Sequence, residues 1–170
     1  VTENVRLVRA VPLRLREETI RAPKSISIRG EVIMLKATFR AFNEELSKLG
    51  QPLAANPRNA GAGLIRWRRA ELKKTRATKE GSLAHAVVQV KEKVLSQLRL
   101  VAYAIAGIDS GPRLSTQAEV LDTLAEWGLP THRHSGTAAA PAIARGMSAV
   151  LEQLKRFETT RDTLPFEVDG

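Results

Sequence analysis

The 170-residue sequence contains no cysteine, which excludes a disulfide scaffold, a thiolate metal site and a cysteine nucleophile. A secreted, disulfide-rich mini-protein is therefore excluded, and the reducing cytoplasm is the expected compartment. Aromatic residues make up only 4% of the chain. No window approaches the roughly 18 consecutive apolar residues that a membrane-spanning helix needs, so we expect no membrane partner.

Acidic residues are scarce relative to basic ones. The chain has 27 Lys and Arg against 18 Asp and Glu, which gives a formal net charge of +9. An excess of this size favours a polyanionic partner. Apolar residues make up 43% of the chain, so wholesale disorder is excluded, and the length suits one domain of ordinary size.

Both ends of the sequence look interrupted. The first residues carry no charged-then-apolar signal pattern, and the last ones stop on an Asp169-Gly170 pair directly after an apolar, β-rich run. A turn pair in that place usually has a partner strand on its far side. We therefore expect a segment of a longer protein, incomplete at both ends.

The hydrophobic periodicity predicts an α+β fold, because strands and helices are interspersed without a repeating βαβ unit. A capping-box spacing, Thr116 to Glu119, marks the start of one helix, and Gly128 supplies its stop. We expect strands over 25–34, 98–109 and 165–168, helices over 37–49, 83–97, 116–127 and 141–157, and a loop over 51–63.

Several common catalytic motifs are missing. The sequence has no Gly-x-Ser-x-Gly turn, no Gly-x-x-x-x-Gly-Lys-Ser/Thr loop and no Gly-x-Gly-x-x-Gly loop. The three histidines, His85, His132 and His134, have no Asp or Glu at ligand spacing around them. A protein metal site needs at least three converging ligands, so we predict none in this chain.

Two residues in the expected strands have alternative interpretations. Glu31 follows Gly30 in an otherwise apolar strand, where a carboxylate either accepts hydroxyl donors of a ribose in a pocket or faces water at a sheet edge. Tyr103, the only tyrosine, either belongs to the core or offers a flat surface on which a base stacks.

The most basic part of the chain follows a loop rich in small residues. Arg58 and Arg66 flank that run, and two guanidinium groups can grip phosphates, although two solvated arginines would give the same pattern. The stretch that follows either faces solvent or contacts a nucleic-acid backbone. It contains Arg66, Arg68, Arg69, Lys73, Lys74, Arg76 and Lys79.

In combination, five segments carry a family resemblance: RGEVIM (29–34), ANPRNAGAG (55–63), LVAYAI (100–105), EWGLP (126–130) and RDTLPFEVDG (161–170). In this order they resemble the adenylation, or nucleotidyltransferase, domain of bacterial NAD-dependent DNA ligases. The resemblance covers nearly the whole chain except about 65–98. It implies antiparallel sheets with flanking helices, in an ATP-grasp-like ligase fold.

The resemblance implies three phosphoryl transfers assisted by Mg²⁺. A lysine takes AMP from NAD, the AMP moves to the 5′-phosphate at a nick in double-stranded DNA, and the 3′-hydroxyl then displaces it. The nucleophilic lysine belongs to a Lys-x-Asp-Gly motif, which this sequence lacks. We therefore expect no catalytic residue in this chain, with the lysine upstream of Val1, and predict that the chain alone is inactive.

The resemblance also implies roles for individual residues. Glu31 would contact the adenosine, Tyr103 would stack on adenine, and Asp169 and Gly170 would begin the Asp-Gly-Val-Val-x-Lys motif at the nucleotide. The DNA contacts would come from Arg58, Arg66, Arg68, Arg69, Lys73 and Lys74.

The chain departs from the family at one place. Leu64-Ile65-Arg66-Trp67 replaces the family's Ser-Leu-Arg-Gln, and a basic insertion follows over about 67–98. Two alternatives remain open: a ligase-like module that binds nucleic acid without catalysis, and, less well supported, an ATP-using RNA ligase or capping-type relative. We expect a monomer.

Overall fold

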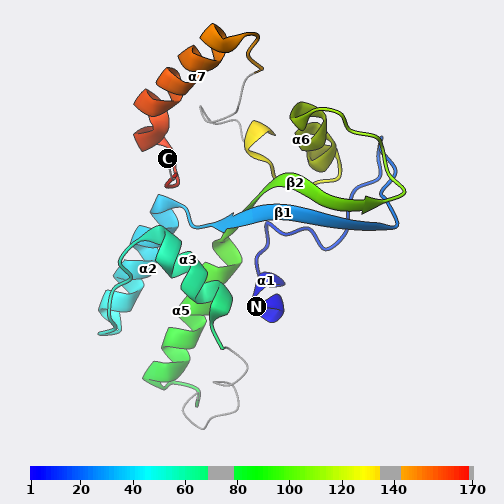
Figure 1. Ribbon diagram of the computed structural model, residues 1–170. Helices are drawn as coiled ribbons and strands as arrows, with labels where there is room; N and C mark the ends of the chain where they lie inside the picture. The colour runs from blue at the N-terminus through cyan, green and yellow to red at the C-terminus, as the bar shows by residue number, and fades with distance from the viewer. Residues whose placement is uncertain (69–78, 135–142, 169–170) are drawn as a thin grey trace. The chain divides into compact units, whose positions relative to one another are not determined.

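The computed structural model describes residues 1–68, 79–134 and 143–168. They form six α-helices, two strands and two short 3-10 helices, so the α+β prediction is confirmed (Figure 1). The helices are α1 (Thr2–Val5), α2 (Lys36–Lys48), α3 (Pro57–Arg66), α5 (Leu83–Gln97), α6 (Gln117–Glu126) and α7 (Met147–Thr160). The strands are β1 (Ser25–Ile33) and β2 (Arg99–Asp109), and the 3-10 helices cover His132–His134 and Arg161–Thr163.

The two strands lie side by side and run in opposite directions (Figure 1). They agree with the predicted strands to within one residue at each end. Within the described residues they form a single two-stranded sheet, rather than the several sheets that the resemblance implied.

The chain forms two compact units. Unit 1 consists of residues 1–11 and 32–99, and unit 2 consists of residues 12–31 and 100–170. Each unit has its own hydrophobic cluster of buried side chains.

The core of unit 1 lies among helices α2, α3 and α5, which contact one another. Its buried side chains include Phe42 and Leu46 from α2, Leu64 from α3 and Leu95 from α5. The helix predicted over 83–97 has those bounds, and Ser82 caps it by accepting a hydrogen bond from the backbone N–H of His85.

The core of unit 2 is centred on Trp127, which is completely buried at the end of α6. The indole Nε1 donates a hydrogen bond to the Ile20 carbonyl at 3.0 Å, which ties α6 to the loop before β1. The capping box is confirmed, and backbone N–H groups of Ser115 and Thr116 lower the pKa of the Glu119 carboxyl. Gly128 follows the helix with a φ of +84°, the left-handed conformation that ends it.

The expected loop over 51–63 is wrong from Pro57 onward, where helix α3 begins. The Asn56 side chain accepts a hydrogen bond from the Asn59 backbone N–H at 2.8 Å, and Pro57 occupies the first helical turn. Asn as the cap and Pro directly after it are a strong helix start, and they outweigh the cost of two interior glycines.

The C-terminal predictions need two corrections. Helix α7 ends at Thr160 rather than Phe157, and its first residue is Met147, while Pro141 lies outside the described residues. The expected strand over 165–168 is wrong, because those residues pair with no strand in the described part of the chain. An extended segment without a hydrogen-bonded neighbour is not a strand.

Replacing Gly30 with alanine will destabilise the protein by about 1–3 kcal/mol, because the neighbouring strand leaves no room. A Cβ at residue 30 would lie 2.9 Å from the Val101 carbonyl oxygen and 3.2 Å from the Ala102 Cα. Gly107→Ala in the same sheet is the matched control, since its Cβ would meet only the Ser27 Cβ at 4.0 Å. Denaturant unfolding measures both variants, and equal losses would contradict the steric explanation.

Candidate functional site

Glu31 of β1 and Tyr103 of β2 are exposed residues in the two neighbouring strands of the sheet. Ile26 and Ile28 of β1, and Leu100, Ala102 and Ile105 of β2, pack into the unit 2 core. The structure therefore places the two residues that the sequence singled out for the adenosine on adjacent strands, with both side chains outside that core.

Both side chains are accessible to a ligand. Tyr103 is 42% exposed, so its interpretation as a core residue is wrong. Glu31 is also exposed, and it makes no side-chain hydrogen bond or ion pair within residues 1–68, 79–134 and 143–168. An exposed aromatic ring can stack on a base, and an exposed carboxylate can accept hydroxyl donors.

Gln117 supports Tyr103, and nothing in the sequence pointed to it. Its side-chain Nε2 donates a hydrogen bond to the Tyr103 carbonyl at 2.6 Å, which joins the first residue of α6 to β2. The capping box predicted where this helix begins, but a contact between residues 14 positions apart leaves no local pattern. Gln117 therefore holds the backbone that carries the candidate stacking residue.

Arg58 and Arg66 stand on helix α3 in unit 1. Both are exposed, and eight residues separate them, or about 12 Å along the helix axis. The Arg66 Nε donates to the Ala62 carbonyl at 3.3 Å, one turn back along the helix. At that separation the two guanidinium groups can contact different phosphates of one strand.

The C-terminal end of α3 is held by Asn4, a second residue that the sequence did not single out. Asn4 is buried, and its Nδ2 donates to the carbonyls of Leu64, Ile65 and Trp67 at 3.2, 3.0 and 2.6 Å. The last carbonyls of a helix have no partner within the helix, so this side chain satisfies them. Asn4 therefore positions the helix that carries both arginines.

Replacing Asn4 with alanine will lower the free energy of unfolding by about 1–3 kcal/mol, the cost of leaving buried carbonyls without a donor. Thr2→Ala on the same short helix is the control, because Thr2 is exposed and the described residues give its side chain no hydrogen bond. Denaturant titration followed by circular dichroism gives both values. A loss for Asn4→Ala no larger than that for Thr2→Ala would show that the cap does not stabilise α3.

The departure at Trp67 has a structural explanation. The Lys91 ammonium of α5 lies 5.5 Å from the centroid of the Trp67 ring, at cation–π distance. The larger aromatic at this position thus joins the end of α3 to α5.

The structure covers only part of the predicted DNA-binding and nucleotide-binding sets. Arg68 is exposed and is the second residue after α3, whereas Arg69, Lys73 and Lys74 lie outside the described residues. Asp169 and Gly170 lie outside them as well.

None of the helices in the described residues combines the length and apolarity that crossing a bilayer requires. The same residues also contain no group of three or more His, Cys, Asp or Glu side chains placed to hold a metal ion.

Comparison with known proteins decides the family. The sequence model of the NAD-dependent DNA ligase adenylation domain matches residues 1–97, which is more than half of the chain. The chain belongs to the NAD-dependent DNA ligase adenylation-domain family. Two similar relatives are a DNA ligase of Geobacter sulfurreducens, 32% identical over 173 residues, and a DNA ligase of Salinibacter ruber, 34% identical over 174 residues. Each alignment covers 100% of this chain and 21% of the relative, so the chain spans about a fifth of the relatives' length.

Proposed function

We propose that this chain supplies the adenosine-binding surface and part of the DNA-binding surface of an NAD-dependent DNA ligase. The observation that carries the proposal is the exposure of Glu31 and Tyr103 on the two adjacent strands of a chain of the adenylation-domain family. An exposed tyrosine ring suits an adenine, and an exposed carboxylate suits the hydroxyls of its ribose. Members of the family use NAD, so NAD is the ligand proposed here.

Tyr103 and Glu31 bind different parts of the adenosine in this proposal. The Tyr103 ring stacks on adenine, and a stacked base contributes about 1–3 kcal/mol. The Glu31 carboxylate accepts hydrogen bonds from ribose hydroxyls, because an ionised carboxylate only accepts. Together they hold the adenosine so that the adenylyl phosphorus is presented to a lysine amine, and such positioning is a large part of catalysis of phosphoryl transfer.

The amine itself comes from outside these 170 residues, which contain no Lys-x-Asp-Gly motif. We also propose Mg²⁺ as the ion that assists the phosphoryl transfers, since Mg²⁺ is commonly held by substrate phosphates together with only one or two carboxylates. What the chain contributes is binding and orientation: adenosine on the unit 2 sheet and DNA phosphates at Arg58 and Arg66. The basic stretch from Arg66 to Lys79 extends the proposed DNA contact.

The finer features of the proposal rest on sequence composition and family resemblance. We propose the ATP-grasp-like arrangement of the complete adenylation domain, of which this chain is a part. We also propose that the protein is monomeric and cytoplasmic, because a cysteine-free, basic chain suits a reducing compartment that contains DNA.

Incubation with NAD labelled in the adenylyl phosphate, in a buffer that contains Mg²⁺, tests the proposal. We expect the native chain to retain the label on a filter and to lose all of it on denaturation, because adenosine binds but no nucleophile is present. Retention by the denatured chain would place a nucleophilic lysine among these residues. Failure of the native chain to retain NAD at millimolar concentration would contradict the adenosine-binding assignment.

A further inference from the structure

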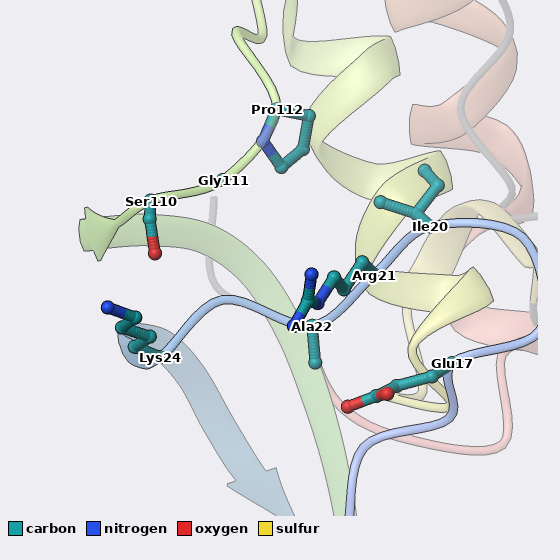
Figure 2. A pocket seen from close by; sticks show the side chains of 8 residues that line it. All are labelled: Glu17, Ile20, Arg21, Ala22, Lys24, Ser110, Gly111 and Pro112. Atoms are coloured by element: carbon teal, nitrogen blue, oxygen red, sulfur yellow. The ribbon is translucent and has the colours of Figure 1, made fainter.

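A cleft lies at the other end of the sheet from Glu31. It is enclosed by the loop before β1 and the turn after β2, and its volume is about 740 Å³ (Figure 2). Its lining consists of Glu17, Ile20, Arg21, Ala22, Lys24, Ser110, Gly111 and Pro112, all of which belong to unit 2. Gly30, the residue before Glu31, lies beside Val101 of the neighbouring strand. Ser110 comes nine residues after Val101, which corresponds to roughly 30 Å along an extended strand. The cleft is therefore separate from the proposed adenosine surface.

Two cations, Arg21 and Lys24, and one carboxylate, Glu17, line this cleft. Neither Arg21 nor Lys24 makes an ion pair or side-chain hydrogen bond with the residues that the structure describes. Figure 2 shows the Lys24 side chain below Ser110 and the Arg21 guanidinium farther along the same loop, beside Ala22. Arg presents a planar fork of donors that fits two phosphate oxygens, and Lys adds a compact positive charge.

Ser110 adds a strained backbone and a hydroxyl to the same cleft. It is the one residue other than glycine with positive φ in the described part of the chain, at +55°. This conformation costs about 1–3 kcal/mol for such a residue, and residues held in it recur at binding and catalytic sites as well as in turns. Figure 2 shows the Ser110 hydroxyl pointing toward Lys24 and into the cleft, where it is a third donor.

The single carboxylate of the cleft limits where an anion can lie. Glu17 enters from the end away from Lys24 and Ser110 (Figure 2). An anion is repelled at that end and attracted at the other, between the two cations and the hydroxyl. The favoured position thus holds a single small anionic group with several acceptor oxygens.

We propose that Arg21, Lys24 and Ser110 bind one phosphodiester group of duplex DNA, as a contact separate from Arg58 and Arg66. This inference rests on the proposed DNA-binding function, and the net charge of +9 favours DNA over an acidic protein as the source of the phosphate. Two cations bound to one phosphate release the counterions of that phosphate. The contact therefore contributes about 1 to the magnitude of the slope of log K against log salt.

The test compares variants of the whole chain on a nicked duplex. Fluorescence anisotropy at several salt concentrations gives the slope of log K against log salt. For Arg21→Gln with Lys24→Gln we expect the slope to become shallower by about 1. The matched control, Lys155→Gln with Arg156→Gln, removes the same charge from exposed positions on α7 and should leave the slope unchanged.

Ser110→Gly separates a binding role from a purely structural one. The change removes the hydroxyl and relieves the positive φ, so we expect higher stability together with weaker DNA binding. Higher stability with unchanged binding would exclude Ser110 from the contact.

Two further results would overturn the inference. One is an unchanged slope for the Arg21 and Lys24 double variant while the wild-type chain binds the duplex, and this result leaves the proposed function intact. The other is loss of binding to inorganic phosphate without any change in the duplex slope, which would make the cleft a site for a small anion only. Absence of wild-type duplex binding would overturn both this contact and the proposed DNA surface, whereas retention of NAD tests the adenosine surface independently.

Discussion

Replacing Trp127 with alanine will lower the free energy of unfolding by about 3–5 kcal/mol, the range for truncation of a buried aromatic side chain. Trp127 is completely buried, and it packs with Ala102 of β2 and Leu124 of α6 in the unit 2 core. Its removal also leaves the Ile20 carbonyl without the indole donor at 3.0 Å. The substitution therefore combines a cavity with a lost long-range hydrogen bond.

Denaturant unfolding followed by far-ultraviolet circular dichroism measures this loss, since the substitution itself alters tryptophan fluorescence. Trp127→Phe is the control, because it keeps an aromatic ring in the core but has no N–H to donate. We expect it to lose less stability than the alanine variant. A loss below about 1 kcal/mol for Trp127→Ala would show that this residue does not organise the core.

Replacing Tyr103 with alanine will weaken binding of adenine nucleotides about 5- to 150-fold, which corresponds to the 1–3 kcal/mol of one stacked base. Because the ring is 42% exposed, its removal leaves only a small defect in the fold. Isothermal titration calorimetry with NAD measures the affinity, and denaturant unfolding measures the stability. The two readouts should separate: a large change in affinity and a small one in stability.

Tyr103→Phe distinguishes stacking from hydrogen bonding by the phenol. The phenylalanine ring offers the same flat face, so we expect its affinity for NAD to stay within about threefold of the wild type, since stacking uses only the ring face. A large loss for Tyr103→Phe would assign the binding energy to the hydroxyl. An unchanged affinity for Tyr103→Ala would remove Tyr103 from the nucleotide surface.

Local sequence signals predicted most of the helices and both strands because those elements carry their own start and stop residues. The capping box at Thr116 defines one helix, apolar residues at helical spacing define the helix over 83–97, and alternation of apolar residues defines β1. Helix α3 was missed because its glycines and proline are typical of loops, although Asn56 caps it. The glycines favoured a loop in the prediction, but the Asn56 cap is the stronger signal at this position.

The apolar stripe of α7 shows the limit of periodicity. Met147, Val150, Leu151 and Leu154 recur at helical spacing, which correctly predicted a helix. None of them is buried by the described residues. A pattern identifies the face that a helix can bury but not what covers it.

Candidate site residues were predictable only where one position carries the signal. Glu31 and Tyr103 stood out as a charged and an aromatic residue in apolar strands, and the structure leaves both exposed. Asn4 contacts residues 60 to 63 positions away, so only the folded chain identifies it. The cleft at Arg21 and Ser110 likewise joins two segments nearly 90 residues apart.

Competition for bound NAD tests the central claim, that this chain carries the adenosine-binding surface of an NAD-dependent ligase. With the chain saturated by labelled NAD, unlabelled AMP or nicotinamide mononucleotide is added at increasing concentration. We predict that AMP displaces NAD because it carries the adenosine that Tyr103 and Glu31 hold, whereas nicotinamide mononucleotide has no effect over the same range. Displacement by nicotinamide mononucleotide but not by AMP would contradict the account.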